Sequence, residues 1–310
     1  MDQHRLRIAT RHSDLALWQA SHVAGRLQAV VPGLEVELVH VTTTGDRDRV
    51  HTLREFGGAG VFTREVQRAV LDGRADVAVH SLKDLPTEPA AGLVLAAVPD
   101  RASPFDVLIL PDGAEPLPSL DDLPQGAHVA TGSLRRQAQL LCRRPDLRLV
   151  EIRGNVPTRI AKLDRGEYDA IVLAEAGLGR LGLKDRISLG LRPPLMFPAV
   201  GQGALGIECR TGDDATRASL ERIIDHSAFA AVRAERTVLR ELRAGCHAPL
   251  GVHTLSDGTR LTLEAVVLSP DGRERLHDAD TGSTEDPESL GRTVARRLQR
   301  QGADRLVATG

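Results

Sequence analysis

The 310-residue sequence predicts an α/β protein with two related lobes and a small C-terminal α+β domain. Three observations lead to this fold class. Short apolar runs alternate with helical periods up to about residue 197, which is typical of parallel α/β proteins. The order of elements in the first hundred residues then recurs in the second hundred. Beyond residue 226, alternating runs joined by Asp-Gly turns indicate antiparallel hairpins.

The first lobe is expected to contain three strands, at residues 5–10, 35–43 and 75–81. A helix should begin after Ser13, a residue type that caps helix N-termini, and Leu15, Trp18 and Val23 lie roughly along one face of it. A second helix is predicted over residues 62–73, where it ends in a glycine. These elements predict a sheet with helices packed on it.

The second lobe repeats this order. The stretch "AHVATGSLRRQAQLL" has the same shape as "LRIATRHSDLALWQA", and residues 147–155 and 166–177 match 36–46 and 73–84. Parallel α/β segments resemble one another in general, but the paired Ala-Thr and Ser turns favour a duplication. Two such lobes place the carboxyl ends of their strands around a shared cleft, where ligands of open α/β sheets bind.

The remaining segments complete three expected domains. Residues 196–210 follow a proline pair and are predicted to cross back to the first lobe. Helices are predicted at 227–245 and at 287–300, on either side of the hairpins. The domains are expected at residues 1–99 with 200–221, at 104–197, and at 226–310.

Composition excludes several classes of protein. The formal net charge of −2 and the 41% hydrophobic content do not suggest nucleic-acid binding. No leader-like segment and no run of 18 apolar residues occurs, so neither secretion nor a membrane partner is expected. Three cysteines without C-x-x-C spacing argue for a reducing cytoplasm and against disulfide or zinc frameworks. Nothing resembles a large apolar interface, so a monomer is expected.

The stretch "ADVAVHSLKDLP" ends a predicted strand with Lys83 and Asp84, at the mouth of the expected cleft. Such a dipeptide is often only a solvated cap. Basic residues recur, however, at equivalent strand ends and helix starts, without an evident acidic partner in the adjacent sequence. Their guanidinium groups suit carboxylates or phosphates, and the absence of a phosphate loop favours carboxylates. These residues are Arg11, Arg135, Arg136, Arg153, Arg159 and Arg180.

Asp84 would then be the one anion in a cationic cleft, where it is expected to be ionised and to stabilise a developing cation. Two opposite charges 4 Å apart attract by about 4 kcal/mol at an effective dielectric constant of ~20. That energy corresponds to roughly a thousandfold in rate.

The cysteines and one long loop complete the candidates. Cys142 and Cys209 are expected to be small buried residues. Cys246 lies on a loop between small residues in "RAGCHAPLG", so a bulky group could be attached to it. The charged, glycine-tipped loop 44–62 is typical of a lid or of a disordered segment.

The sequence resembles the porphobilinogen deaminase (hydroxymethylbilane synthase) family over nearly its whole length. The matching motifs include "RIATRHSDLALWQA", "GVFTREV", "ADVAVHSLKDLP", "GSLRRQAQL", "RLVEIRGNVPTR", "PAVGQGALGIECR" and "GCHAPLG". The resemblance implies two periplasmic-binding-protein-like lobes and a third domain. It also implies a transferase of tetrapyrrole (haem/chlorophyll-type) biosynthesis, which condenses four porphobilinogen molecules head to tail with loss of ammonia. The growing oligopyrrole would be built on a dipyrromethane cofactor held by a thioether to Cys246.

The resemblance also assigns residue roles by motif. Asp84 is the expected catalytic carboxylate, and Phe62 would pack on a pyrrole ring. The carboxylates of substrate and cofactor would be bound by Arg11, Ser13, Ser81, Lys83, Thr131, Ser133, Arg135, Arg136, Arg153, Arg159, Arg180 and Gln202. No metal or nucleotide is implied. Two alternatives stay open: a non-catalytic bilobal solute-binding or effector-sensing module, and a transferase that uses the Cys246 thiol directly as a nucleophile.

Overall fold

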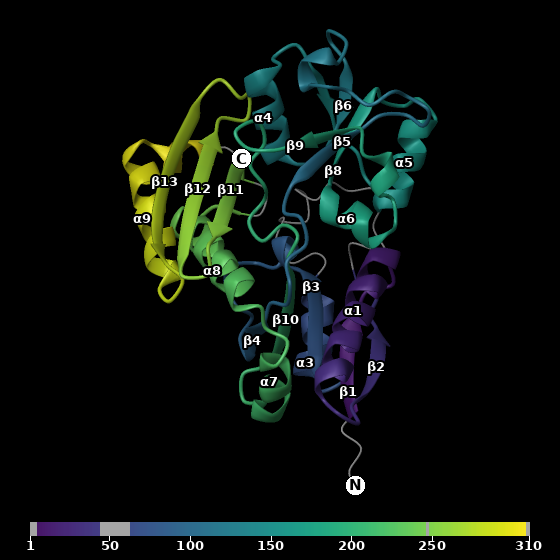
Figure 1. The fold of residues 1–310 in the computed structure, drawn as a ribbon, viewed down its shortest axis with the longest axis vertical. Coiled ribbons are helices and arrows are strands. Elements are labelled where there is room, and N and C mark those ends of the chain that lie inside the picture. Colours follow the sequence, from purple (N-terminus) through teal and green to yellow (C-terminus); the bar gives the residue numbers. More distant parts are fainter. Residues whose placement is uncertain (1–4, 44–62, 246–247, 308–310) are drawn as a thin grey trace.

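A computed structural model describes residues 5–43, 63–245 and 248–307, and these form three sheets with their helices (Figure 1). The predicted lid at 44–62, Phe62 and Cys246 lie outside the described residues. No helix in the described ranges is long and apolar enough to pass through a membrane.

The first sheet has the strand order β2-β1-β3-β10-β4. Strands β1, β2 and β3 are parallel, and β10 runs antiparallel between β3 and β4. The crossing segment predicted near residue 200 therefore supplies a strand of this sheet. The strands are β1 (Arg5–Thr10), β2 (Glu35–His40), β3 (Val77–Ser81), β4 (Leu93–Ala97) and β10 (Leu205–Arg210).

In the described part of the chain, the helices that accompany this sheet are α1 (Asp14–Val30), α3 (Arg64–Leu71) and α7 (Asp214–Glu221). Helix α1 begins where predicted, because the Ser13 side chain accepts a hydrogen bond of 3.4 Å from the amide of Ala16. Its buried residues Val23 and Leu27 pack with Ile8 of β1 in one core. Helix α3 packs on the other face, against Ala78.

The second sheet repeats the same order, β7-β6-β8-β5-β9, with β6, β7 and β8 parallel and β5 antiparallel between β8 and β9. This correspondence confirms the pair of related lobes. The strands are β5 (Asp106–Ile109), β6 (His128–Ala130), β7 (Arg148–Val150), β8 (Ala170–Ala174) and β9 (Leu189–Leu191). The helices are α4 (Leu134–Arg143), α5 (Val156–Asp164) and α6 (Glu175–Arg180).

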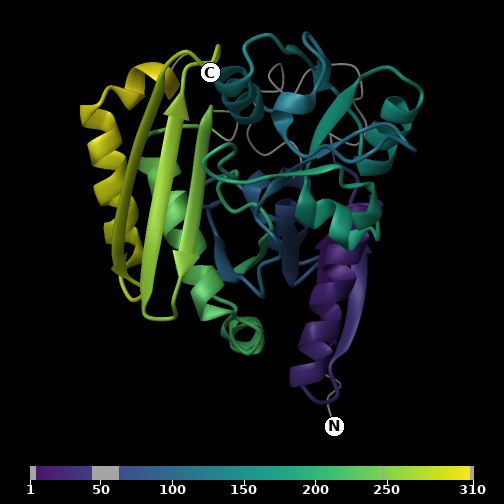
Figure 2. The ribbon, with the colours of Figure 1, turned by 45° about the horizontal axis from the view of Figure 1, so that its top comes forward.

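The third sheet is the antiparallel array β11 (Leu250–Ser256), β12 (Arg260–Leu268) and β13 (Arg275–Ser283). The two predicted Asp-Gly turns connect its strands. Helices α8 (His226–Glu241) and α9 (Pro287–Arg300) cover one face, followed by α10 (Ala303–Val307). Val238, Leu263 and Val294 belong to the core between these layers. Figure 2 shows this unit alongside the two lobes.

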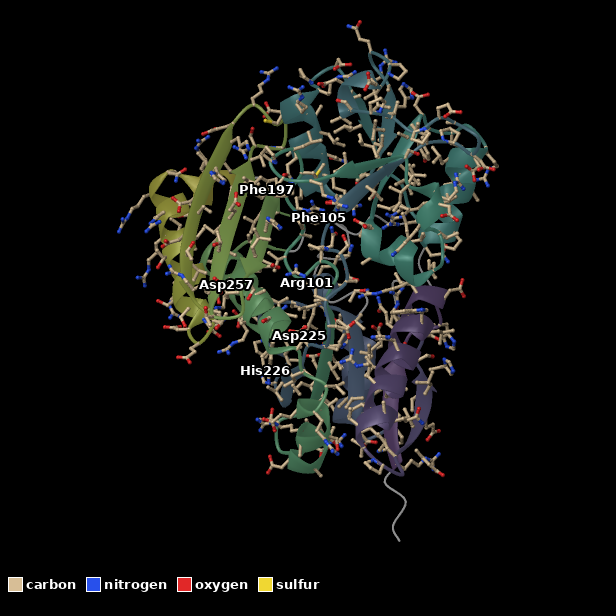
Figure 3. The ribbon with its side chains drawn as sticks, viewed as in Figure 1. Arg101, Phe105, Phe197, Asp225, His226 and Asp257 are labelled. Carbon is tan, nitrogen blue, oxygen red and sulfur yellow. The ribbon has the colours of Figure 1, made fainter. Side chains whose placement is uncertain are left out.

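A buried ion pair joins the third sheet and its helices, here called the third unit, to the two segments that connect the lobes, one containing Arg101 and the other Gly201. Arg101, in the first of these segments and labelled in Figure 3, donates hydrogen bonds of 2.6 and 3.1 Å to the carboxylate of Glu235 on α8. The amide of Gly201, in the second segment, donates to the same carboxylate at 2.8 Å. Glu235 is completely buried, so this contact fixes α8 against both connections.

The two described cysteines differ in burial, whereas both were expected to be buried. Cys209 is buried in β10, as predicted. Cys142 is exposed, and the prediction of burial was wrong. It lies in the last turn of α4, after Leu140, the last residue of the helix that is buried, and the exposed Arg143 follows it.

Candidate active site

A small pocket of about 80 Å³ lies at the carboxyl ends of β1 and β3, between the beginnings of α1 and α3. Parallel strands direct their following loops to this edge, so side chains far apart in sequence meet there. The polar residues that line the pocket are Arg11, Ser13, Gln19, Thr63, His80, Ser81 and Asp84.

Asp84 is held at the rim of this pocket by a short 3-10 helix, η1 (Leu82–Asp84). Leu82 is buried and anchors the loop, and its amide donates a 3.0 Å hydrogen bond to the carbonyl of Ala204. It packs so closely on β10 that a Cβ at Gly206 would lie 2.6 Å from it. The Asp84 carboxylate is exposed above this anchor, within electrostatic range of Lys83 and of Arg159 in the other lobe.

Lys83 points into the junction of the lobes. Its Nζ donates a 3.3 Å hydrogen bond to Oε1 of Gln202. Burial of the ammonium group lowers the pKa of Lys83 to about 8; the charges of Arg136 and Arg135 lower it further, while Asp84 and Asp106 oppose the shift. The lysine is therefore a desolvated cation that a bound anion would stabilise.

Arg135 and Arg136 have an acidic partner, contrary to the expectation from sequence. Nη1 of Arg135 lies 2.7 Å from Oδ2 of Asp106, and Nη2 of Arg136 lies 2.7 Å from Oδ1. All three side chains are buried. Burial alone would raise the pKa of Asp106, but the two guanidinium charges and hydrogen bonds from Arg135 and Gln202 hold it well below its usual range.

The partner was missed because it lies far from the arginines in sequence, on β5. One signal could have found it: Asp106 is a lone carboxylate at the head of the apolar strand "DVLIL". The pairing is incomplete, because Nε of Arg135 is buried without a hydrogen-bond partner in the described ranges. The two arginines thus combine a structural ion pair with spare donor capacity.

Gln202 connects this ion pair to the first lobe. Its Nε2 donates hydrogen bonds to the carbonyl of Pro104 at 2.7 Å and to Oδ1 of Asp106 at 3.0 Å. Its Oε1 accepts from Lys83. Since Gln202 is 1% exposed, the structure places it as a buried link between Lys83 and Asp106.

Two further arginines extend the cluster on the second lobe. Arg159 donates a 2.8 Å hydrogen bond to the carbonyl of Gly154, and burial lowers its pKa to about 10, as do the charges of Arg136 and Arg153, while Asp84 opposes the shift. Arg153 is partly buried, with its Nε 3.7 Å from a carboxylate oxygen of Glu151. The charge of Arg159 interacts with that of Asp84 across the junction.

Arg180 lies in a different setting. Its Nη2 donates to the carbonyl of Gly203 at 2.7 Å, and its guanidinium carbon lies 5.6 Å from the ring centre of Trp18 on α1. Burial lowers the pKa of Arg180 to about 10, and its Nε has no hydrogen-bond partner among the described residues. It therefore bridges α6 and α1 while keeping one unused donor.

The predicted hydroxyl residues lie near helix starts. Ser81 accepts a 2.8 Å hydrogen bond from Nε2 of Gln19, a buried pocket residue that sequence reasoning missed. Thr131 is fully buried, and its hydroxyl accepts from the amide of Ser133 at 3.3 Å. Ser133 precedes α4 without capping it by its side chain.

The arrangement can bind several carboxylates and stabilise one cation. The charge of Arg136 acts on both Lys83 and Arg159, and Asp84 is the carboxylate at the rim of the neighbouring pocket. Guanidinium groups bind carboxylates in two-pronged geometry, and a carboxylate opposite a developing positive charge lowers its energy.

Comparisons with known proteins agree with this chemistry. Residues 6–218 match the family model "Porphobilinogen deaminase, dipyromethane cofactor binding domain", and residues 229–300 match "Porphobilinogen deaminase, C-terminal domain". A porphobilinogen deaminase from Syntrophotalea carbinolica is 45% identical, covering 99% of this chain and 96% of its own. One from Xanthomonas euvesicatoria pv. vesicatoria is 50% identical, covering 98% of each.

Among solved structures, the methionine-binding protein MetQ matches with a TM-score of 0.44 and 15% identity, over 76% of this chain and 94% of its own. A sulfonate-binding protein from Methylobacillus flagellatus matches with a TM-score of 0.40 and 17% identity, over 78% and 69%. The family models and the two relatives decide the assignment, since they cover nearly the whole sequence. The chain belongs to the porphobilinogen deaminase family.

Proposed function

We propose that this protein is a hydroxymethylbilane synthase, which condenses four porphobilinogen molecules head to tail with loss of ammonia. The observation that carries the proposal is the exposed Asp84 carboxylate opposite desolvated cations of both lobes. Porphobilinogen carries two carboxylates on a pyrrole ring, and losing ammonia leaves that ring positively charged. The site offers cations that can bind the two carboxylates and an anion that can stabilise the positively charged ring.

The residues present fit the dipyrromethane cofactor that the family model names. Buried donors of Arg135 and Arg180 lack hydrogen-bond partners among the described residues, and the charges of Lys83 and Arg159 are desolvated. A group with several carboxylates would satisfy them. The residues proposed to hold it are Lys83, Thr131, Ser133, Arg135, Arg136, Arg153, Arg159 and Arg180, with attachment at Cys246. When bound, the cofactor supplies an electron-rich pyrrole carbon to which the first substrate is joined.

The chain's own residues perform the remaining tasks. Arg11, Ser13 and Ser81 would orient the carboxylate arms of the incoming pyrrole at the pocket beside Asp84, and Phe62 would pack on its ring. Asp84 would accept a hydrogen bond from the pyrrole N–H and stabilise the positive charge as ammonia departs. Its attraction for a cation 4 Å away is about 4 kcal/mol at an effective dielectric constant of ~20. Gln202 would hold Lys83 in place.

The proposal includes the organisation of the chain and its setting. We assign residues 1–99 with 200–221 to the first domain, 104–197 to the second and 226–310 to the third. We place the enzyme in the cytoplasm as a monomer, without a nucleic-acid or membrane partner.

Intact-mass measurement of the purified protein tests the covalent cofactor. The expected mass exceeds that of the chain by two porphobilinogen units less the ammonia lost, and Cys246→Ala removes the excess. Cys142→Ala is the matched control, since the exposed Cys142 should leave the excess in place. An unmodified, fully active protein would exclude the primer, and an unmodified, inactive one would favour a solute-binding module.

Substitution of Asp84 tests the chemical role. Asp84→Asn keeps the size of the side chain but removes its charge, so turnover of porphobilinogen should fall about a thousandfold while the attached cofactor is retained. Glu88→Gln removes an exposed charge four residues further along the same loop and should not slow turnover. Near-normal turnover in Asp84→Asn would remove Asp84 from the mechanism.

A further inference from the structure

The floor of the pocket beside Asp84 contains a buried hydroxyl without a partner. Thr63 lines this pocket and is 1% exposed, and its Oγ1 has no hydrogen-bond partner among the described residues. Leaving a buried hydroxyl unpaired costs free energy, so such a group calls for an explanation.

Other polar groups in and beside the pocket lie close to partners, although Nε2 of His80 makes no hydrogen bond among the described residues. Nε2 of Gln19 donates to Ser81, and Nε2 of His80 lies 3.0 Å from Oε2 of Glu208. Gln67 donates to both oxygens of the same Glu208 carboxylate, at 2.9 and 3.2 Å. Of the hydroxyls that line the pocket, those of Ser13 and Ser81 accept hydrogen bonds, whereas that of Thr63 has no partner among the described residues.

Thr63 also fails to perform the usual task of its position. It precedes α3 at the N-cap, where a threonine side chain normally accepts a hydrogen bond from an amide of the first turn, but it makes no such bond. The Thr63 hydroxyl is therefore not used as a helix cap and has no hydrogen-bond partner among the described residues.

The pocket favours a small anion. Two helices begin at its wall, α1 after Ser13 and α3 after Thr63, and helix N-termini carry partial positive charge. Arg11 adds a full positive charge. A volume of about 80 Å³ is large enough to hold a carboxylate arm.

We propose that the Thr63 hydroxyl donates a hydrogen bond to one carboxylate arm of the incoming pyrrole and helps to select substrates that carry it. This inference rests on the proposed function. Because Asp84 lines the same pocket, an arm anchored at Thr63 brings the ring of the substrate next to the catalytic carboxylate. Thr63 is then a specificity-determining residue of the first lobe, separate from the arginines of the second.

Three variants test the role of Thr63 in the full-length holoenzyme. Thr63→Val removes the hydroxyl at nearly constant shape, so KM for porphobilinogen should rise about tenfold, as for a lost hydrogen bond to a charged group, with kcat changed less than twofold. Thr63→Ser restores a hydroxyl and should recover most of the affinity. Thr254→Val removes another unpartnered buried hydroxyl, on β11, and should leave KM unchanged.

Two further measurements separate binding from packing. The melting temperature of Thr63→Val without substrate should equal or exceed that of the wild type, because an unpaired buried hydroxyl has been removed. Competitive inhibition by porphobilinogen analogues lacking the acetate or the propionate should show that Thr63→Val loses discrimination against one of the two.

The outcomes are distinguishable. An unchanged KM in Thr63→Val, or equal increases in Thr63→Val and Thr63→Ser, would overturn the role of Thr63 while leaving the enzymatic function intact. A wild-type protein that consumes no porphobilinogen would contradict the proposed function instead. Equilibrium dialysis with porphobilinogen then decides the role of Thr63, since equal binding by wild type and Thr63→Val would overturn it.

Discussion

Asp106→Asn is expected to destabilise the second lobe by about 3–5 kcal/mol, the cost of leaving buried charges without their partner. Asparagine keeps the shape and can still accept one hydrogen bond. It removes the negative charge that Arg135 and Arg136 share at 2.7 Å each, in a site where the carboxylate is completely buried. Two buried guanidinium groups would then face each other uncompensated.

Urea unfolding at pH 7 measures this effect lobe by lobe. Trp18, the only tryptophan, lies on α1 of the first lobe, and Tyr168, the only tyrosine, lies just before β8 of the second. In Asp106→Asn, the midpoint urea concentration of the transition followed by tyrosine fluorescence should fall by more than that of the transition followed by tryptophan fluorescence. Glu167→Gln, which breaks the exposed pair with Arg165, is the control and should cost less than about 1 kcal/mol.

The pH dependence provides a second check. The pKa of Asp106 is lower in the folded than in the unfolded chain, so its contribution is fully present above the unfolded value of 3.8 and is lost as pH falls further. The difference between wild type and Asp106→Asn should therefore be constant between pH 5 and 6, below the range in which Lys83 titrates. A loss below about 1 kcal/mol at pH 7 would show that the arginines are stabilised by other groups and refute the reasoning.

Four further predictions concern the junction of the lobes. Lys83, with a pKa of about 8, loses its charge as pH rises through that value, so KM for porphobilinogen should increase between pH 7 and 9, and Lys83→Arg should flatten this increase. Because the pKa of Lys83 in the folded protein lies below the ordinary 10.5, charging Lys83 opposes folding below pH 8. Lys83→Met should therefore raise the melting temperature at pH 7. A lower melting temperature would contradict the desolvation of Lys83. Glu235→Gln leaves Arg101 unpaired and should lower the free energy of unfolding by about 3–5 kcal/mol. Limited proteolysis should then release the third sheet and its helices faster. An unchanged rate of proteolysis would contradict the role of the ion pair in holding this unit. Gly203→Ala places a Cβ in steric overlap with the carbonyl of Ala102, at a φ of +85°, and should lower the melting temperature. The control Gly212→Ala, whose Cβ meets nothing within 4 Å, should not.

Much of the fold could be predicted because local patterns decide it. Ser13 caps α1, Pro287 begins α9, and the two Asp-Gly turns connect the strands of the third sheet. The exposure of Cys142 was not predictable in this way. A helical period distinguishes apolar from polar faces, but it does not show where the last turn of a helix leaves the core.

The sequence predicted which residues form the candidate site better than it predicted which of them pair with one another. The resemblance named Asp84, Lys83 and the arginines, but the sharing of Asp106 between two of them depends on pairing between distant strands. Thr63 carries no sequence signal as a binding residue, since threonine before a helix is normally read as a cap. Its unpaired hydroxyl becomes visible only when the surrounding hydrogen bonds are known.

The insertion of β10 between β3 and β4 has a consequence for synthesis on the ribosome. The second sheet uses only residues 106–191, so it can close as soon as that stretch has emerged. The first sheet must wait for residues 205–210, and at 5–20 residues per second that delay lasts roughly 5 to 20 s. During this time β3 and β4 expose unpaired edges, the kind of surface that chaperones protect. The lobe that is translated first is therefore completed last.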